Sequence, residues 1–171
     1  MAKRLSLREF QEDLVRRFAE AQSGDRRALL GVRAGRENWL LNLTDSGEIL
    51  PTPPLAAVPL THEWFRGLAN VRGTLFSVVD FSAFQHGPLT TPGGPARLLL
   101  VGARHGANCA LLVSNALGLR NPDDFQPDSG APDDERPWVQ ARLRDARDHL
   151  WFKLDVPKLL AHRAFLQAGL D

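Results

Sequence analysis

The sequence predicts a mainly β fold made of two small barrels, with a helix near each end of the chain. From Ala28 onward, short apolar runs alternate with turn residues, a spacing that is typical of barrels and sandwiches. A loop rich in Gly and Pro at residues 85–95 then divides the chain into two β-rich halves of similar length. A chain of 171 residues is long enough for one domain that buries about 70% of its unfolded surface.

Residues 1–27 are expected to form an N-terminal segment with an amphipathic helix. Ser6 and Glu9 have the spacing of a capping box, and apolar residues follow at helical intervals until Gly24. The apolar positions are Leu7, Phe10, Leu14, Phe18 and Ala21. This face suits either the chain's own domain or another protein, and the sequence leaves both open.

The first barrel is expected at about residues 28–73. Apolar runs at 29–33 and 39–43 flank the turn residues 34–36 and predict a hairpin. Residues 50–59 contain too many prolines for a β-ladder, so they are expected to form an extended loop. A turn at 61–65 then leads into a second hairpin.

The second hairpin, residues 64–81, is the most informative stretch of the chain. Its two apolar runs meet at Gly73, which supplies the positive φ of a tight turn. Gly67 indicates a chain bend or a close backbone approach. Asn70 is expected to satisfy neighbouring backbone groups. Residues 74–81 are apolar on both alternation sets and therefore predict a strand covered on both faces.

Two charged residues of this hairpin have open roles. Arg72 lies at the tip, where it is expected either to contact another protein or to form an internal pair with Glu48 or Asp80 that ties the two barrels together. Asp80 ends the second strand and has two possible roles. It is either a catalytic carboxylate or a cap of the next turn, where it would accept a hydrogen bond from the N–H of Ser82 or Ala83. The cap is favoured because no second carboxylate stands at a fixed spacing from Asp80, as a catalytic pair would need.

The second barrel is expected at about residues 74–149. Runs at 97–103 and 107–114 predict paired strands, and the acidic, proline-rich stretch 121–137 is expected to be an exposed excursion. Residues 138–144 alternate as a strand does. A last strand and a helix capped by Asp155 are expected at 149–169, within a domain that extends over 28–171.

No pattern in the sequence predicts a catalytic, metal or cofactor site. The single cysteine, Cys109, is expected in the core and excludes an intramolecular disulfide. Glycine-rich phosphate loops and nucleophile elbows are absent. The five histidines lack metal-ligand spacing; they are His62, His86, His105, His149 and His162. We therefore expect no enzyme activity, no metal and no cofactor.

The charge pattern and the N-terminus bear on location and partners. A net charge of +1, with both signs interspersed, provides no broad field for nucleic acid or anionic lipid. The first residues lack the apolar core of a signal peptide, and no run approaches the roughly 20 apolar residues that span a bilayer. These observations predict a cytoplasmic protein without direct membrane insertion.

A nucleic-acid-binding small barrel is the alternative from a different functional class. Its binding face would consist of Arg142, Arg144 and Arg147 beside Trp138. Interspersed Asp145 and Asp148 weaken this interpretation.

The run Gly67-Leu68-Ala69-Asn70-Val71-Arg72-Gly73, followed by an apolar strand that ends in Asp80, resembles the central signature of CheW-like domains. These domains are adaptors that couple bacterial chemoreceptors to their histidine kinase. The sequence of this motif is most similar to the PilI-type branch of the family, which acts in chemosensory systems of type IV pili and twitching motility. The likeness covers about residues 28–165, with further similar segments at Glu48-Ile49 and 154–160. Gly47 and Ser114 depart from the common family pattern.

The resemblance implies two five-stranded, SH3-like barrels over a shared hydrophobic core, and an adaptor without catalysis. The implied partners are the regulatory domain of a CheA-type histidine kinase and the cytoplasmic tip of a methyl-accepting chemoreceptor, with recruitment to the inner face of the membrane through that receptor and no nucleic acid. A flagellar chemotaxis pathway is the alternative to twitching motility. The contact candidates are Glu48, Ile49, Asn70 and Arg72, and Gly67 and Gly73 are structural turn glycines.

Overall fold

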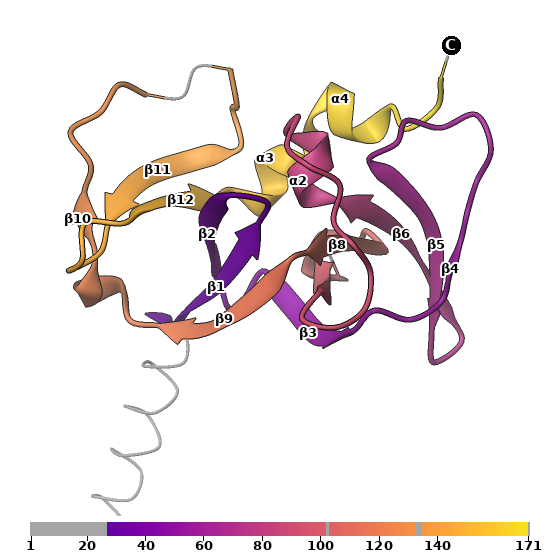
Figure 1. Ribbon diagram of the computed structural model, residues 1–171, viewed down its shortest axis with the longest axis horizontal. Coiled ribbons are helices and arrows are strands. Elements are labelled where there is room, and N and C mark those ends of the chain that lie inside the picture. The colour runs from indigo at the N-terminus through magenta and orange to yellow at the C-terminus, as the bar shows by residue number, and fades with distance from the viewer. Residues whose placement is uncertain (1–26, 102, 133–134, 171) are drawn as a thin grey trace, which may run out of the picture.

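The computed structural model describes residues 27–101, 103–132 and 135–170 (Figure 1). Within them, two six-stranded β-sheets lie side by side, and three short α-helices lie near the junction between the sheets. The mainly β fold class is therefore confirmed. The amphipathic helix predicted near the N-terminus lies outside the described residues.

Sheet A has the strand order β10-β11-β12-β2-β1-β9. Its strands are β1 (Leu29–Ala34), β2 (Glu37–Asn42), β9 (Asn115–Arg120), β10 (Gln126–Pro127), β11 (Val139–Arg144) and β12 (Leu150–Leu154). The predicted hairpin is confirmed as the antiparallel pair β1–β2, with Gly35 and Arg36 in its turn. The pairing of β12 with β2 is parallel.

Sheet B has the order β3-β7-β8-β6-β5-β4. Its strands are β3 (Ser46–Pro51), β4 (Leu55–Ala56), β5 (Phe65–Val71), β6 (Thr74–Asp80), β7 (Arg97–Val101) and β8 (Cys109–Val113). The predicted pairs β5–β6 and β7–β8 are both confirmed as antiparallel. The pairing of β6 with β8 is parallel.

The division of the chain between the sheets differs from the expected barrels at 28–73 and 74–149. The chain leaves sheet A after β2, builds all of sheet B, and returns to sheet A at β9. Each sheet has six strands where five were expected, and no pairing among the described strands joins the two edges of either sheet. The expected boundary is wrong because the parallel pairings connect strands far apart in sequence, which local patterns do not reveal.

Two segments expected to be loops contain strands. Pro51 ends β3, and β4 lies within the proline-rich segment; both are edge strands, where a missing ladder N–H is tolerated. The stretch 121–137 holds a 3-10 turn, η2 (Pro122–Asp124), and β10. It is also only partly exposed, because Phe125 is buried with its ring 5.5 Å from that of Trp151.

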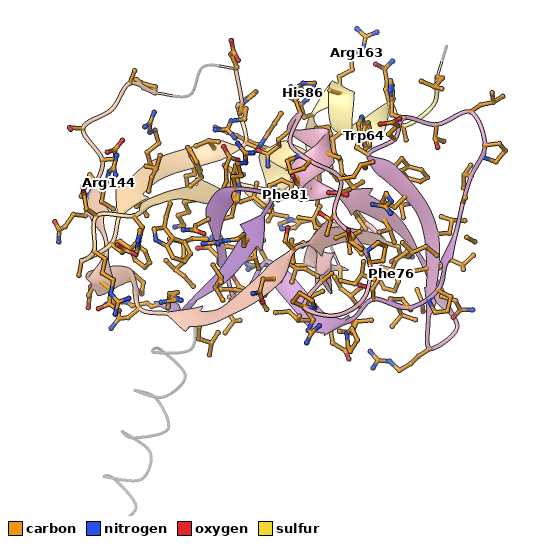
Figure 2. All side chains as sticks on the ribbon, in the orientation of Figure 1. Trp64, Phe76, Phe81, His86, Arg144 and Arg163 are labelled. Atoms are coloured by element: carbon orange, nitrogen blue, oxygen red, sulfur yellow. The ribbon has the colours of Figure 1, made fainter. Side chains whose placement is uncertain are left out.

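A hydrophobic core shared by the two sheets is confirmed. Trp39 of β2 and Leu99 of β7 both belong to it, and both are fully buried. Helix α2 (Phe81–Phe84) contributes Phe81, whose ring lies 4.8 Å from Trp39 in an edge contact between the sheets (Figure 2). A separate small core lies within each sheet. The shared core thus fixes how the sheets pack against each other.

The C-terminal helix is capped as predicted but is divided in two. Asp155 accepts a hydrogen bond from the Lys158 N–H at 3.1 Å at the start of α3 (Val156–Ala161). His162 has extended backbone and begins α4 (Arg163–Leu166). Phe165 of α4 is buried against Phe84, 5.4 Å away, which anchors the second helix on the shared core. Within the described ranges, none of the helices has the length and apolar character needed to cross a membrane.

Candidate functional site

The tip of the β5–β6 hairpin brings together most of the residues predicted for the site. Arg72 and Gly73 have φ angles of 51° and 86°, so both central turn residues are left-handed, as in the turns that match strand twist. The Asn70 side-chain oxygen accepts a hydrogen bond from the Gly73 N–H at 2.8 Å. The predicted geometry of Asn70 and Gly73 is therefore confirmed.

Gly67 lies in β5, away from the tip. Its φ is 108°, and the β5–β6 register shifts between Phe65 and Gly67. A Cβ atom at this position would clash with the carbonyl oxygen of Ala56 in β4. Both predicted reasons for glycine, the bend and the close backbone approach, apply here.

Arg72 pairs with Glu48 on the edge strand β3. Its Nη1 donates to Oε1 of Glu48 at 3.0 Å, and its Nη2 donates to Oε2. Glu48 lies where the β3–β7 register shifts between Ser46 and Ile49, and such bulges re-aim side chains. The sequence left Glu48 and Asp80 open as internal partners of Arg72, and in the structure the partner is Glu48. Since both residues belong to sheet B, the expectation that this pair ties the two barrels together is wrong.

The pair faces solvent. The Arg72 and Glu48 side chains are 71% and 44% exposed. The hydrogen bond from Arg72 lowers the pKa of Glu48, and the same bond raises the pKa of Arg72. Both groups are therefore charged at neutral pH and accessible to a partner protein.

An exposed apolar residue lies near the turn of the same hairpin. Leu75 of β6 is paired with Asn70 across the hairpin and is 56% exposed. The prediction that both faces of β6 are covered is therefore wrong at the start of the strand, where β6 extends beyond the core. The sequence does not single out Leu75, because its neighbours in the strand are also apolar.

Ile49 does not join this surface. Its side chain is partly buried and packs against the shared core. The structure thus brings together Glu48, Asn70 and Arg72 at one end of sheet B and directs Ile49 inward.

Asp80, at the other end of the hairpin, is a structural residue. The predicted cap is confirmed, because Asp80 accepts a hydrogen bond from the Ala83 N–H at 3.2 Å. It also accepts from the N–H and hydroxyl of Thr90 at 2.7 and 2.9 Å, and from Arg66 at 3.1 Å. Asp80 is fully buried. Fully bonded and shielded from solvent, this carboxylate ties the 85–95 loop to the hairpin and has no access to a substrate.

The residues of the nucleic-acid alternative do not form an exposed basic and aromatic face. Arg142 and Arg144 both pair with Asp128, at 3.1 and 2.9 Å. The hydrogen bond from Arg144 lowers the pKa of Asp128, which keeps that carboxylate charged. Trp138 is buried, and its indole N–H donates to Gln85 at 3.2 Å.

The core cysteine is confirmed. Cys109 is buried in β8, and burial raises the pKa of its thiol to about 12. In the part of the chain that the structure describes, no three His, Cys, Asp or Glu side chains lie together as a metal site would need.

Comparison with known proteins finds similarity in sequence and, separately, in fold. Residues 28–164 match the family model of the CheW-like domain. Protein PilI of Pseudomonas aeruginosa is 25% identical over 147 residues, which are 82% of this chain and 79% of that protein. The crystal structure of the scaffolding protein TtCheW from Thermoanaerobacter tengcongensis superposes with a TM-score of 0.67 at 15% identity, covering 81% of this chain and 95% of that one. At this identity the structural match concerns the fold alone.

Proposed function

The chain belongs to the CheW-like domain family, and from that premise we propose that it couples a chemoreceptor to a CheA-type histidine kinase without catalysing a reaction. The family assignment itself makes it a scaffold or adaptor of chemotaxis-type signalling. The similarity to PilI supports a system that controls type IV pili and twitching motility. A flagellar pathway is the alternative.

The single observation that carries the proposal is the exposed Arg72–Glu48 pair within the matched region. A receptor tip made of amphipathic helices presents charged and apolar side chains on adjacent turns, and the exposed Leu75 near the same hairpin turn complements such a face. Arg72 has donors beyond those used by Glu48, because a guanidinium carries five N–H groups. These donors suit a carboxylate or a backbone carbonyl of the receptor.

In this role the protein works in the cytoplasm and is recruited to the inner face of the membrane by its receptor. It neither inserts into the bilayer nor binds nucleic acid. Two observations support the second of these statements: Arg142 and Arg144 share the carboxylate of Asp128, and Trp138 is buried and therefore not available to stack on a base.

Binding to the kinase is tested by calorimetry with the whole chain and the purified regulatory domain of the cognate kinase. We expect saturable binding, with a dissociation constant at or below tens of micromolar, because transient signalling interfaces are often small. Absence of binding at these concentrations would contradict the proposal.

The role of the hairpin tip is tested by Arg72→Glu in a reconstituted receptor and kinase assay. We expect the variant to keep its circular dichroism spectrum and to lose receptor control of kinase autophosphorylation, because the reversed charge repels Glu48 and the receptor contact. Arg36→Glu is the matched control, since Arg36 is an exposed arginine in the hairpin turn of sheet A. Intact receptor control in Arg72→Glu would exclude the tip as the contact.

The pathway is tested by deleting the gene and restoring either the wild type or Arg72→Glu. Loss of twitching with normal swimming, restored by the wild type alone, is the expected result. Loss of swimming with normal twitching would favour the flagellar alternative.

A further inference from the structure

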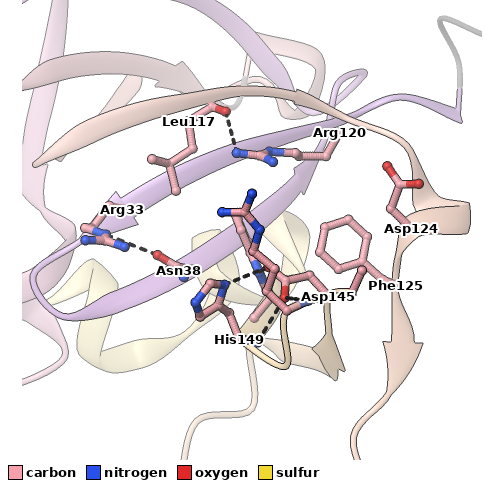
Figure 3. A pocket seen from close by; sticks show the side chains of 11 residues that line it. Arg33, Asn38, Leu117, Arg120, Asp124, Phe125, Asp145 and His149 are labelled. Carbon is pink, nitrogen blue, oxygen red and sulfur yellow. Dashed lines mark hydrogen bonds and ion pairs between the residues drawn. The ribbon is translucent and has the colours of Figure 1, made fainter.

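A cavity of about 500 Å³ with a basic lining lies on sheet A (Figure 3). None of the hairpin-tip residues of sheet B lines it. Strands β1, β2, β9 and β12 and the turn between β11 and β12 contribute its walls. Three arginines line it, Arg33, Arg120 and Arg147, together with His149. Their clustering is a tertiary effect, because they come from three different segments of the chain.

The two carboxylates of the cavity form no ion pair with these arginines. Asp145 accepts hydrogen bonds from the N–H groups of Arg147 and His149, both at 2.9 Å, and from the Trp151 indole at 3.0 Å. It also contacts the His149 ring nitrogen at 3.1 Å. Burial alone would raise the pKa of Asp145, but these hydrogen bonds outweigh it and hold the pKa at about 2. The second carboxylate, Asp124, is exposed in η2 and forms no ion pair with a described residue.

The arginines themselves have only neutral partners. Arg33 donates to the side-chain oxygen of Asn38 at 3.1 Å, and Arg120 donates to the carbonyl of Leu117 at 3.0 Å. The side chain of Arg147 is exposed and donates to none of the described residues. With three arginines against two carboxylates, the cavity carries an excess of one positive charge, and none of its arginines is ion-paired with a described residue.

Glycine at position 31 leaves room for the side chains that pack around Arg120. Trp151 and Leu117 lie 3.3 Å from the position that a Cβ of Gly31 would take, so a side chain there would displace them. Arg120 covers Trp151, with its guanidinium carbon 5.3 Å from the ring centroid. Only 3% of Trp151 is exposed, so its ring is not available for stacking by a ligand.

We propose that this cavity binds the carboxylate side chains of an acidic segment in a protein partner. Guanidinium groups hold carboxylates with short, charge-assisted hydrogen bonds. Leu117 and Phe125 line the same cavity and suit the methylene groups of a glutamate. The inference concerns a second surface and does not rest on the proposed role of the hairpin tip.

Two other anionic ligands fit the cavity less well. Phosphate sites commonly use backbone N–H groups, but those of the β11–β12 turn already donate to Asp145. A nucleotide would also need an aromatic face for its base, and Arg120 covers Trp151. These two observations favour an acidic peptide segment.

The test uses the whole chain and a fluorescein-labelled hexaglutamate peptide, with binding followed by fluorescence anisotropy. We expect saturable binding that weakens as salt is added. The triple variant Arg33→Gln, Arg120→Gln, Arg147→Gln should bind at least about tenfold more weakly, because three charge-assisted contacts are lost. The matched control changes three exposed arginines outside the cavity, Arg36→Gln, Arg104→Gln and Arg163→Gln, and should bind within about twofold of the wild type.

The triple variant could lose binding through misfolding, since Arg120 packs on Trp151, so a second variant leaves Arg120 unchanged. Arg147→Gln alters only an exposed side chain, and we expect an unchanged circular dichroism spectrum with binding weakened about threefold. Inorganic pyrophosphate serves as the competing anion. The proposal is overturned if hexaglutamate does not bind, if the control triple variant loses as much affinity, or if pyrophosphate binds where the peptide does not.

Discussion

Two carboxylates of sheet B each pair with an arginine of the same β5–β6 hairpin, yet their surroundings are opposite. Asp80 is completely buried and pairs with Arg66 at 3.1 Å, whereas Glu48 pairs with Arg72 in solvent and is 44% exposed. Asp80 also receives hydrogen bonds from Thr90 and Ala83. The difference shows that burial, and not the type of ion pair, separates a group that holds the fold from one that is accessible to a partner.

Asp145 of sheet A provides an intermediate case, with a side chain that is 21% exposed. If burial decides the contribution to stability, then removing these carboxylates should have effects in the order Asp80, Asp145, Glu48. The hairpin that carries both arginines also depends on Gly67. Replacement of Gly67 is therefore compared with removal of the three carboxylates.

The largest effect is expected for Asp80→Ala. The change leaves Arg66, Thr90 and Ala83 without their acceptor, which should lower the free energy of unfolding by about 3 kcal/mol. Urea unfolding measures this loss, and Thr90→Val, which removes only one side-chain bond, should cost about 1 kcal/mol. A loss below about 1 kcal/mol in Asp80→Ala would contradict the structural role of the buried pair.

Gly67→Ala should lower the free energy of unfolding by about 2 kcal/mol. The methyl group meets the Ala56 carbonyl, and the backbone at φ 108° is strained for any residue with a Cβ. Gly73→Ala is the matched control, because φ is 86° there but no atom lies within 4 Å of the added Cβ. Equal losses in the two variants would show that the close approach of β4 adds nothing.

Asp145 should contribute about 1 kcal/mol, and the contribution should depend on pH. Its folded pKa of about 2 is below the usual 3.8, so the contribution is present above pH 3.8 and is lost as the pH falls through 2. The figure of about 1 kcal/mol allows for the partial exposure of the group. Unfolding of the wild type and Asp145→Asn between about pH 2 and 5 measures it. A difference between the two proteins that does not shrink toward pH 2 would contradict this assignment.

The smallest effect on stability is expected for Glu48→Gln and Arg72→Gln. The pair lies in water and is screened by salt, so each urea midpoint should move less than in Asp145→Asn. A double-mutant cycle in urea isolates the interaction between the two side chains. If Arg72→Gln destabilises the protein as much as Asp80→Ala does, the exposed pair is a structural element and the comparison fails.

The parts of the site that the sequence could predict are those that depend on neighbouring residues. The turn at Gly73 and the Asn70 cap form within the hairpin itself. For the internal partner of Arg72, the sequence left two candidates, Glu48 and Asp80. The hydrogen bonds between Thr90 and Asp80 were not predicted, because the 85–95 loop brings Thr90 to Asp80 only in the folded protein. The grouping of Arg147 with Arg33 and Arg120 in the sheet A cavity was also not predicted, since three separate segments supply these arginines.

The sequence by itself determined the mainly β fold, the hairpins β1–β2, β5–β6 and β7–β8, and the Asp155 cap. Each of these depends on turn residues and alternation within a short stretch. Only the tertiary structure decided which strands share a sheet and which charges are buried. The parallel pairs β12–β2 and β6–β8 form across long connections, so they depend on which apolar faces meet in the shared core. That packing buries Asp80 and leaves Arg72 and Glu48 in solvent.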